Sequence, residues 1–388
     1  ATQFDPLTTT PFAALSATAI GALTSDPIAG LTTTQAAALT AGEMAGLLDT
    51  QVAALSTTRL AALTTTQIRG LGARGFAALS TTQVAALTTT QIGALSAAQL
   101  AGLADTQVVA LGATGVAALS SAQIAALSTT GIEALTATEI GALSTTRIVG
   151  LTATQVGALL STQIAALSTE QLRALTTTQI AGLGAALVAA LGGTGLTALS
   201  STQLAALGAD GIAGLTTSAL AAMATTQLAA LSATAVAGFA TTQIRALTAA
   251  QIAALTTTQV AALTATEVGA LDATAIAALG TRQIAALSGA AIGGLTASGA
   301  ADLSTTQLGA MNTAQIAALT TTAIAGLDVG DLAALTTRQL ASFTSTQIGA
   351  LTATQIGGLD PTRLAALTTT EIAGLTSTQV AALSATQL

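Results

Sequence analysis

Large apolar side chains recur in two columns along the chain, each with a period of eight residues. The first column holds Leu at every eighth position from Leu7 to Leu383, apart from Met223, Phe239, Met311 and Phe343. The second column runs from Phe4 to Leu388, and only Ala36 and Ala300 in it are small. All five Phe and all three Met fall in these columns, as expected of buried positions. The repeating octad is therefore the structural unit of the chain.

A second pattern accompanies the leucine column and predicts where helices begin. The residue after each leucine position is Ser, Thr, Asp, Asn or Gly except at Leu48, Ala104, Leu160, Ala224 and Ala240. All 26 Gln lie in one column, which is three residues after this position in the octad, and the same column also holds Glu43, Glu139, Glu267 and Glu371. Ser or Thr followed three residues later by Gln or Glu is a capping box, in which each side chain bonds the backbone amide of the other residue. Each octad thus predicts its own helix start.

The remaining octad positions fit the same short helix. Leu precedes the cap and Ile or Val lies at the fourth helical position, the two places of a hydrophobic staple. Asp360 and Pro361 form a capping residue followed by a first-turn proline, whereas Pro11 and Pro27 lie at the third helical position. The two residues before each leucine are mostly Ala or Gly, which permit a sharp corner and close backbone approach. We predict a helix of about six residues in each octad.

Two other architectures compete with this one. In one continuous helix the leucine stripe would drift by about 80° per octad, so no partner could cover it. A β-solenoid remains an alternative, because Thr, Ile and Val favour strands and a corner could fall inside each octad. We predict an all-α solenoid of about 48 short capped helices, with Leu, Ile and Val inside and Thr and Gln outside or at the helix starts. The pattern does not fix the number of octads per superhelical turn or the handedness.

The unbroken register predicts one array over residues 1–388, although a chain of this length would ordinarily form two or three globular domains. Residues 1–31 are slightly irregular and are a candidate N-terminal cap, with Phe4-Asp5-Pro6, Pro11 and Pro27. Residues 181–220 and 288–302 are richer in Gly and should be looser. The sequence starts at Ala1 without a signal peptide, as expected of a mature product or of a piece of a longer array.

Composition excludes several classes of function. The net charge is −7, with nine Arg, no Lys and sixteen acidic residues, so a basic surface for nucleic acid is missing. The chain has no Cys and no His, which excludes disulfides, the usual zinc site, and Ser-His or Cys-His nucleophiles. The longest uncharged apolar run, residues 180–193, is shorter than the roughly 20 residues of a membrane-spanning helix.

A few short motifs could carry chemistry, and each has a structural interpretation. Residues 70–75 match G-x-G-x-x-G, and residues 193–198 match its looser form, but neither lies in the strand–loop–helix context of a dinucleotide site. Asp328 and Asp331 lack the third carboxylate of a calcium loop and fit a helix cap. Glu133 and Glu139 come nearest to an acid–base pair. We predict no catalytic, cofactor-binding or metal-binding residues, no cofactor, and no enzymatic activity.

Runs of threonine give a regular series of hydroxyl groups, at residues 64–66, 88–90, 176–178 and 256–258. The simpler interpretation is one helix cap followed by two solvated residues of the first turn. The alternative is a flat Thr surface that binds ice or a polysaccharide.

The run Leu-[Ser/Thr]-x-Thr-Gln-[Ile/Val]-Ala-Ala-Leu resembles the octapeptide arrays of very large surface or secreted proteins of proteobacteria, loosely called adhesins or haemagglutinin-like proteins. The resemblance covers essentially the whole chain and implies an extracellular fibre, stalk or surface matrix, without naming site residues. We expect a structural protein that associates with itself, because an open-ended solenoid exposes its last turn. The alternative function is an adhesin, or an ice- or polysaccharide-binding module.

Overall fold

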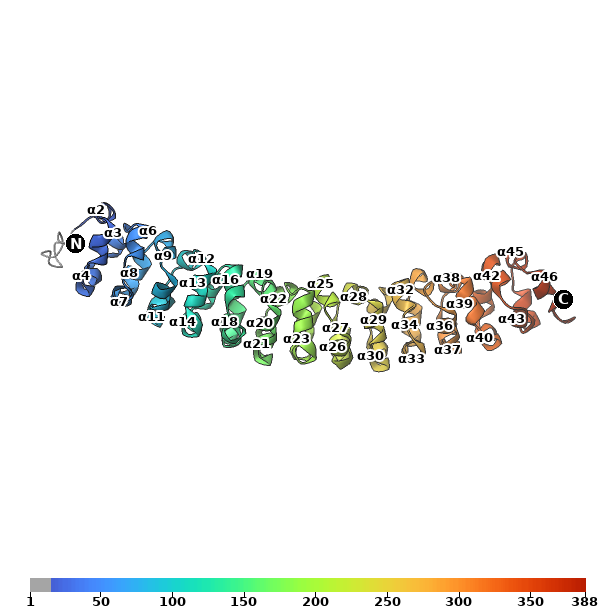
Figure 1. Cartoon of the computed structure of the whole chain (residues 1–388). Helices are drawn as coiled ribbons and strands as arrows, with labels where there is room; N and C mark the ends of the chain where they lie inside the picture. Colours follow the sequence, from blue (N-terminus) through green and yellow to red (C-terminus); the bar gives the residue numbers. More distant parts are fainter. Residues whose placement is uncertain (1–14) are drawn as a thin grey trace. The chain divides into compact units, whose positions relative to one another are not determined.

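The computed structural model describes residues 15–388, which form 45 helices, α2 to α46, and contain no strand (Figure 1). One helix begins in each octad from residue 17 to residue 377, except that α23 spans two octads. The predicted all-α solenoid of short helices is therefore confirmed over this range, and the β-solenoid is excluded there. The candidate cap residues Phe4, Asp5, Pro6 and Pro11 lie outside the described residues.

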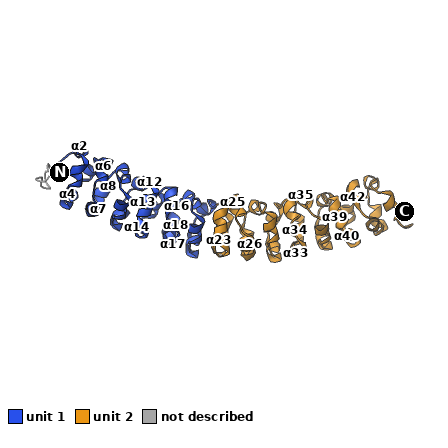
Figure 2. Ribbon diagram, in the orientation of Figure 1, with its two compact units in different colours: residues 1–183 blue, residues 184–388 orange. Residues whose placement is uncertain are grey.

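The chain divides into two compact units, the first ending at Leu183 and the second beginning at Gly184 (Figure 2). The first unit contains α2 (Ala17–Gly21), α3 (Ser25–Ala29), α4 (Thr33–Ala38), α5 (Ala41–Ala45), α6 (Asp49–Ala53), α7 (Thr57–Ala62), α8 (Thr65–Gly70), α9 (Ala73–Ala77), α10 (Thr81–Ala85), α11 (Thr89–Gly93), α12 (Ala97–Ala101), α13 (Asp105–Ala110), α14 (Gly112–Ala118), α15 (Ser121–Ala125), α16 (Thr129–Ala134), α17 (Ala137–Gly141), α18 (Thr145–Gly150), α19 (Ala153–Gly157), α20 (Ser161–Ala165), α21 (Thr169–Ala174) and α22 (Thr177–Ala181).

The second unit contains α23 (Ala185–Ala198), α24 (Ser201–Ala205), α25 (Ala209–Ala213), α26 (Thr217–Ala222), α27 (Thr225–Ala230), α28 (Ala233–Val236), α29 (Thr241–Arg245), α30 (Ala249–Ala254), α31 (Thr257–Ala261), α32 (Ala265–Val268), α33 (Ala273–Ala278), α34 (Thr281–Ala286), α35 (Gly289–Ile292), α36 (Ala297–Ala301), α37 (Thr305–Ala310), α38 (Thr313–Ala317), α39 (Thr321–Gly326), α40 (Val329–Ala334), α41 (Thr337–Leu340), α42 (Ser345–Ala350), α43 (Ala353–Gly357), α44 (Pro361–Ala365), α45 (Thr369–Ile372) and α46 (Ser377–Ala381).

The helix starts have the predicted capping chemistry. Before α11, Thr88 is extended, with φ −72° and ψ 155°, and its Oγ1 accepts from the amide of Gln91 at 3.2 Å. The Gln91 Oε1 in turn accepts from the Thr88 amide at 2.9 Å. Asp360 caps α44, whose first residue is Pro361, and accepts from the Arg363 amide at 2.9 Å. Local cap chemistry thus defines most of the helix starts, although such a short helix is stable only when neighbouring helices cover it.

Helices three octads apart pack against each other, so one turn of the solenoid takes three octads. In the first unit α5 packs on α8, α10 on α13 and α15 on α18, and in the second unit α24 packs on α27 and α36 on α39. Both apolar columns point inward: Leu87 is 7% exposed and Ile92 is 3% exposed. This count of octads per turn is the quantity that the sequence pattern left open.

The small residues before each leucine lie where the backbone of an adjacent turn approaches. A Cβ atom added at Gly70 would lie 2.7 Å from the carbonyl oxygen of Ala41, and one at Gly182 would lie 2.8 Å from that of Ala153. Both partners begin a helix of an earlier turn, α5 and α19 respectively. The predicted close backbone approach is therefore present between successive turns, and it explains why larger side chains are avoided at this position.

At two places the usual corner between octads is missing, and a glycine with positive φ lies there instead. Gly112 has φ 64° and Gly192 has φ 60°, and these are the only positive φ angles among residues 15–388. At the first, Leu111 is helical, so α13 leads directly into α14. At the second, two octads merge into the 14-residue α23. The second lies in the segment predicted to be loose, whereas the sequence pattern did not single out Gly112.

Candidate functional site

The most regular polar feature of the structure joins a helix start to the turn of the solenoid before it. Gln91, whose Oε1 accepts from the cap amide of α11, donates from Nε2 to the carbonyl oxygens of Leu60 at 2.8 Å and Leu63 at 2.7 Å. The side chain is 3% exposed. One amide group therefore satisfies the start of its own helix and two backbone acceptors of the preceding turn.

The same bond to the leucine-column residue 28 positions earlier recurs through both units, and we call these side chains the glutamine ladder. Its members with that bond are Gln51, Gln67, Gln83, Gln91, Gln99, Gln107, Gln123, Gln155, Gln163, Gln171 and Gln179 in the first unit, and Gln227, Gln243, Gln251, Gln259, Gln283, Gln307, Gln315, Gln339, Gln347, Gln355, Gln379 and Gln387 in the second. Each bond satisfies a backbone carbonyl between turns, where an unpaired acceptor would be costly.

The ladder corrects the predicted place of glutamine. Gln does lie at the helix starts, but most of its side chains are buried between turns rather than on the outside. The signal that could have revealed this is the presence of Arg in the same column, at Arg59, Arg147 and Arg363. Arg is also a donor, and Arg147 bonds from Nε to the carbonyl oxygen of Leu119, 28 residues earlier, at 2.7 Å.

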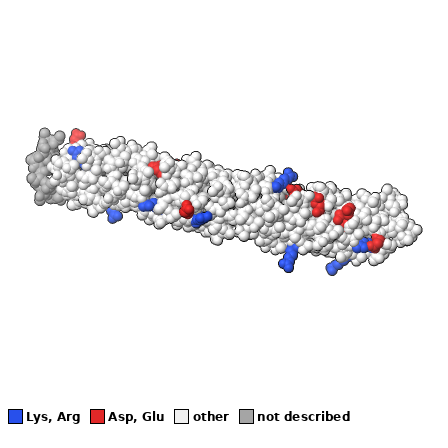
Figure 3. Space-filling view, turned by 90° about the horizontal axis from the view of Figure 1, so that it is seen from below, with Lys and Arg blue, Asp and Glu red and all other residues white. Residues whose placement is uncertain are grey.

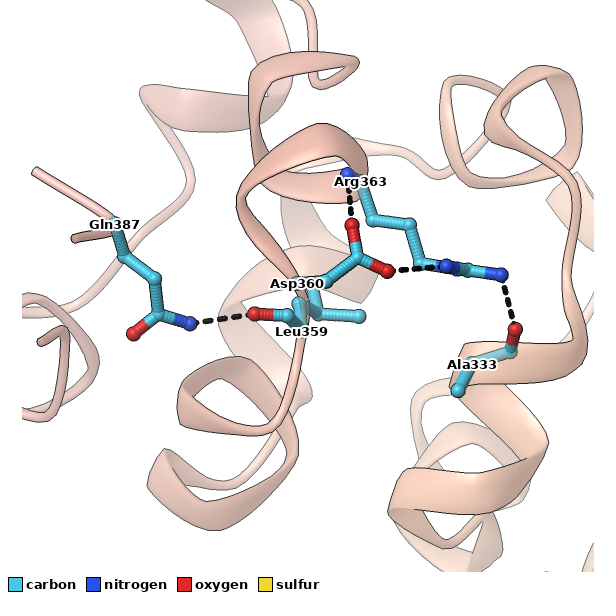
Figure 4. Close-up of polar contacts among 5 residues, drawn as sticks. All are labelled: Ala333, Leu359, Asp360, Arg363 and Gln387. Carbon is cyan, nitrogen blue, oxygen red and sulfur yellow. Dashed lines mark hydrogen bonds and ion pairs between the residues drawn. The ribbon is translucent and has the colours of Figure 1, made fainter.

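Figure 4 shows glutamine and arginine in this role side by side. Gln387 donates from Nε2 to the Leu359 carbonyl oxygen at 2.6 Å, and Arg363 donates to the carbonyl oxygen of Ala333. Arg363 also pairs with the capping carboxylate of Asp360. Hydrogen bonds from the Arg363 backbone and side chain hold the pKa of Asp360 below its usual value. Glutamine and arginine in this column therefore share a side-chain donor that reaches the preceding turn.

Acidic residues in the ladder column keep the bond to the cap amide but have no side-chain donor when they are ionised. Glu43, Glu267 and Glu371 each accept from the amide of their cap residue with Oε2, but Oε1 of each is buried without a hydrogen-bond partner. Burial raises the pKa of Glu267, against the opposing effect of hydrogen bonds with Thr264 and the backbone of Phe239. Ionised carboxylates cannot donate, so these positions differ chemically from the rest of the ladder.

The glycine motifs serve packing in the structure. Gly70 ends α8 against the backbone of Ala41, Gly72 caps α9, and Gly75 lies against Val52. Residues 193–198 form the second half of α23. The described residues contain no strand, so neither motif has the strand–loop–helix setting of a dinucleotide site.

The candidate acidic residues are engaged in capping rather than brought together as a site. Asp328 and Asp331 form a reciprocal cap on α40, with bonds of 2.7 and 2.9 Å. Burial raises the pKa of Asp331, and the nearby Asp328 adds to this shift. Glu139 accepts from the Thr136 amide at 2.8 Å, whereas Glu133 lies on another helix, α16. Among residues 15–388, no three acidic side chains cluster as metal ligands would, and no helix is both long and apolar enough to cross a membrane.

The exposed surface is dominated by small uncharged side chains, and charged residues are scattered over it (Figure 3). The second helical position of every third octad forms one column of exposed Thr in the first unit: Thr34, Thr58, Thr82, Thr106, Thr130, Thr154 and Thr178. In the second unit the corresponding positions are Thr202, Thr226, Ala250, Thr274, Ser298, Thr322, Thr346 and Thr370. Of the Thr runs named from the sequence, only Thr178 lies in this column, which contains no charged side chain.

Hollows on the described surface are lined by the same small residues. One is bordered by Ser121, Thr145, Thr146, Val149, Gly150 and Ala174. Another lies beside the ion pair of Arg74 and Asp49, whose charged atoms are 2.8 Å apart. Neither brings together an acid, a base and a nucleophile, so the polar chemistry of the chain is concentrated in the contacts between turns.

Comparison with known proteins agrees with the repeat architecture. The family model of the ALTTAQ repeat matches residues 52–89, 108–145, 138–169, 164–193, 235–265 and 324–361. These matches confirm that the chain is a tandem repeat array. No curated protein matches the chain.

Proposed function

We propose that this array, which matches the ALTTAQ repeat, is a structural protein without catalytic activity: a self-associating subunit of an extracellular filament, stalk or surface matrix. The observation that carries the proposal is the glutamine ladder. About half of the octads use a glutamine side chain to join one turn to another, rather than to line a cavity. The stability of such a chain increases with its length, because each added turn forms the same contacts as the turn before it.

The surface also supports self-association. It is dominated by small uncharged side chains, and its few charged residues are scattered, so little electrostatic repulsion keeps copies of the chain apart.

The resemblance to large bacterial surface proteins supports an extracellular location. The absence of Cys and the sparse charge agree with a chain that serves by its length and surface rather than by redox or ionic chemistry. Labelling of intact source cells with an antibody to the array tests this part. Labelling only after permeabilisation contradicts it.

Electron microscopy and sedimentation velocity of the purified chain test the filament role. We expect filaments or concentration-dependent oligomers. A monomer at all concentrations contradicts the filament role.

A second function is favoured by the uncharged Thr column, namely an adhesin or a module that binds ice or a polysaccharide. Thr82, Thr106 and Thr130 are consecutive exposed members of that column. Retention of the chain on ice or on an insoluble polysaccharide, lost on Thr→Val replacement at these three positions, would favour this function. Equal retention of the replaced chain would contradict it.

A further inference from the structure

One ladder position combines full burial with a missing donor. Glu267 lies in α32 and is 2% exposed. Its Oε2 accepts from the Thr264 amide at 2.7 Å, as Oε1 of a ladder glutamine does, whereas its Oε1 is buried and has no partner. Gln155, in an octad that differs only by Gln for Glu, donates from Nε2 to Leu127 at 2.8 Å. The free oxygen of Glu267 therefore stands in the place of a donor.

No cation neutralises this carboxyl group. The helices that pack against α32 are α29 and α35. The residue 28 positions before Glu267 is Phe239, which follows α28. Neither α28 nor α35 carries a titratable side chain, and the charged residue of α29, Arg245, donates to the carbonyl oxygen of Ala270 at 3.4 Å. The next cap carboxylate, Asp272, accepts from the Ala275 amide. Within residues 15–388 the ion pairs join other residues.

We propose that Glu267 binds a proton in the folded array, which lets Oε1 donate toward the preceding turn as a ladder glutamine does from Nε2. The proton remains covalently bound to the carboxyl group, so the acid matches the amide in both hydrogen-bonding roles. Loss of the proton leaves a buried anion whose Oε1 has no hydrogen-bond partner, which is unfavourable. The site therefore binds a proton, and protonation strengthens the contact between α32 and the turn before it.

A buried carboxylate oxygen without a hydrogen-bond partner recurs at two other positions of the ladder column. Glu43 and Glu371 also have a buried Oε1 without a partner. Phe occurs in the leucine column only at Phe239 and Phe343, the positions that a ladder bond would reach from Glu267 and Glu371. This pairing across turns is an independent sign that the acidic positions form a distinct kind of site. The proposal holds whether or not the chain forms filaments.

The sign of the pH effect follows from burial, which raises the pKa of Glu267 in the folded state. The folded chain then binds the proton more tightly than the unfolded chain, so the stabilising contribution is complete below the unfolded pKa. It is lost as the pH rises through the folded pKa. The contact between α32 and the turn before it should therefore be firmer in acid than at neutral or alkaline pH.

Hydrogen exchange measured by mass spectrometry tests this locally, in peptides that cover residues 232–275, with exchange rates corrected for the intrinsic effect of pH. For Glu267→Gln we expect slower exchange than wild type at about pH 8 and an equal rate at about pH 4. Glu139→Gln, measured in its own peptides, is the control, because the surrounding octad is nearly identical but Glu139 is partly exposed, and Leu111, 28 residues before it, is helical. It should leave exchange unchanged at both pH values.

The reverse substitution, Gln155→Glu, should introduce the same pH dependence in the peptides that cover residues 124–159. A carboxylic acid band in the infrared spectrum of the folded wild type that persists above the pH at which exposed carboxyl groups ionise, and that is absent from Glu267→Gln, would support the proton directly. A pH-independent difference between wild type and Glu267→Gln overturns the proposal. Protection at about pH 8 that depends on added calcium and on Glu267 also overturns it, since the ligand would then be a metal ion.

Discussion

Gln91 donates from its side-chain Nε2 to the carbonyl oxygen of Leu63, at 2.7 Å across 28 residues of sequence. The same side chain accepts from the Thr88 amide, three residues before it. One residue therefore couples the formation of a helix to the stacking of that helix on the preceding turn. This coupling explains how helices of about five residues, unstable alone, form a continuous array.

Replacement of this glutamine by a side chain of similar length without an amide should destabilise the array. Gln91→Met leaves the buried carbonyl of Leu63 and the Thr88 amide without their partner, at a cost of about 1–3 kcal/mol for each unsatisfied group. Chemical denaturation should show a lower midpoint, with the greatest loss of amide protection near Leu63. The neighbouring exposed residue gives the control, since Thr90→Ser should change the midpoint little. Equal midpoints for the two variants would show that the bond contributes nothing.

Close approach of backbones can be tested at two glycines of one segment. A side chain at Gly70 would meet the Ala41 backbone, so Gly70→Ser should destabilise the array by about 1–3 kcal/mol through overpacking. At Gly72 a Cβ atom meets nothing within 4 Å, and this residue caps α9 without a side-chain bond. Gly72→Ser should therefore be neutral or stabilising, because Ser can accept from the first turn. Thermal unfolding measures the midpoints of both variants. A lower midpoint for Gly72→Ser than for Gly70→Ser would contradict the assigned contacts.

The helix starts were predictable because capping depends on residues within one octad. The fold class, the two apolar columns, the caps and the close approach of small residues all follow from such local patterns, as at Thr88 and Gly70. The three-octad turn was not predictable, because it depends on corner angles that accumulate until residues of successive turns meet. For the same reason the sequence suggested the cap role of Gln but not its bond to the preceding turn.

The two breaks in the octad corner show a further limit of the pattern. Gly112 and Gly192 occupy the cap column as Gly72 and Gly184 do, yet only the first two adopt positive φ. The local residue type permits both conformations, so the choice depends on how the adjoining helices pack. The candidate motifs, in contrast, could be assigned from sequence, because Asp328 and Asp331 lie in register with every other cap.

The leucine column should tolerate no charge. Leu127 is 4% exposed, and Leu127→Asp buries a carboxylate without a cation, at a cost of several kcal/mol. We expect the octads around residue 127 to lose helicity, measured by far-ultraviolet circular dichroism during thermal unfolding. Thr129→Ser, two residues later in the first turn of α16, should leave the curve unchanged. If neither variant shifts the curve, the leucine column is not the core.

Arginine in the ladder column should be replaceable by glutamine but not by an apolar residue. Arg147 donates from Nε to Leu119 at 2.7 Å, but a guanidinium cannot accept from the cap amide of Ser144. Arg147→Gln supplies both functions, so the thermal midpoint should stay the same or rise. Arg147→Met keeps the length of the side chain but removes the donor, and should lower the midpoint by an amount similar to that of Gln91→Met. If Arg147→Gln is as damaging as Arg147→Met, the guanidinium charge rather than its hydrogen bond to Leu119 maintains this contact between turns.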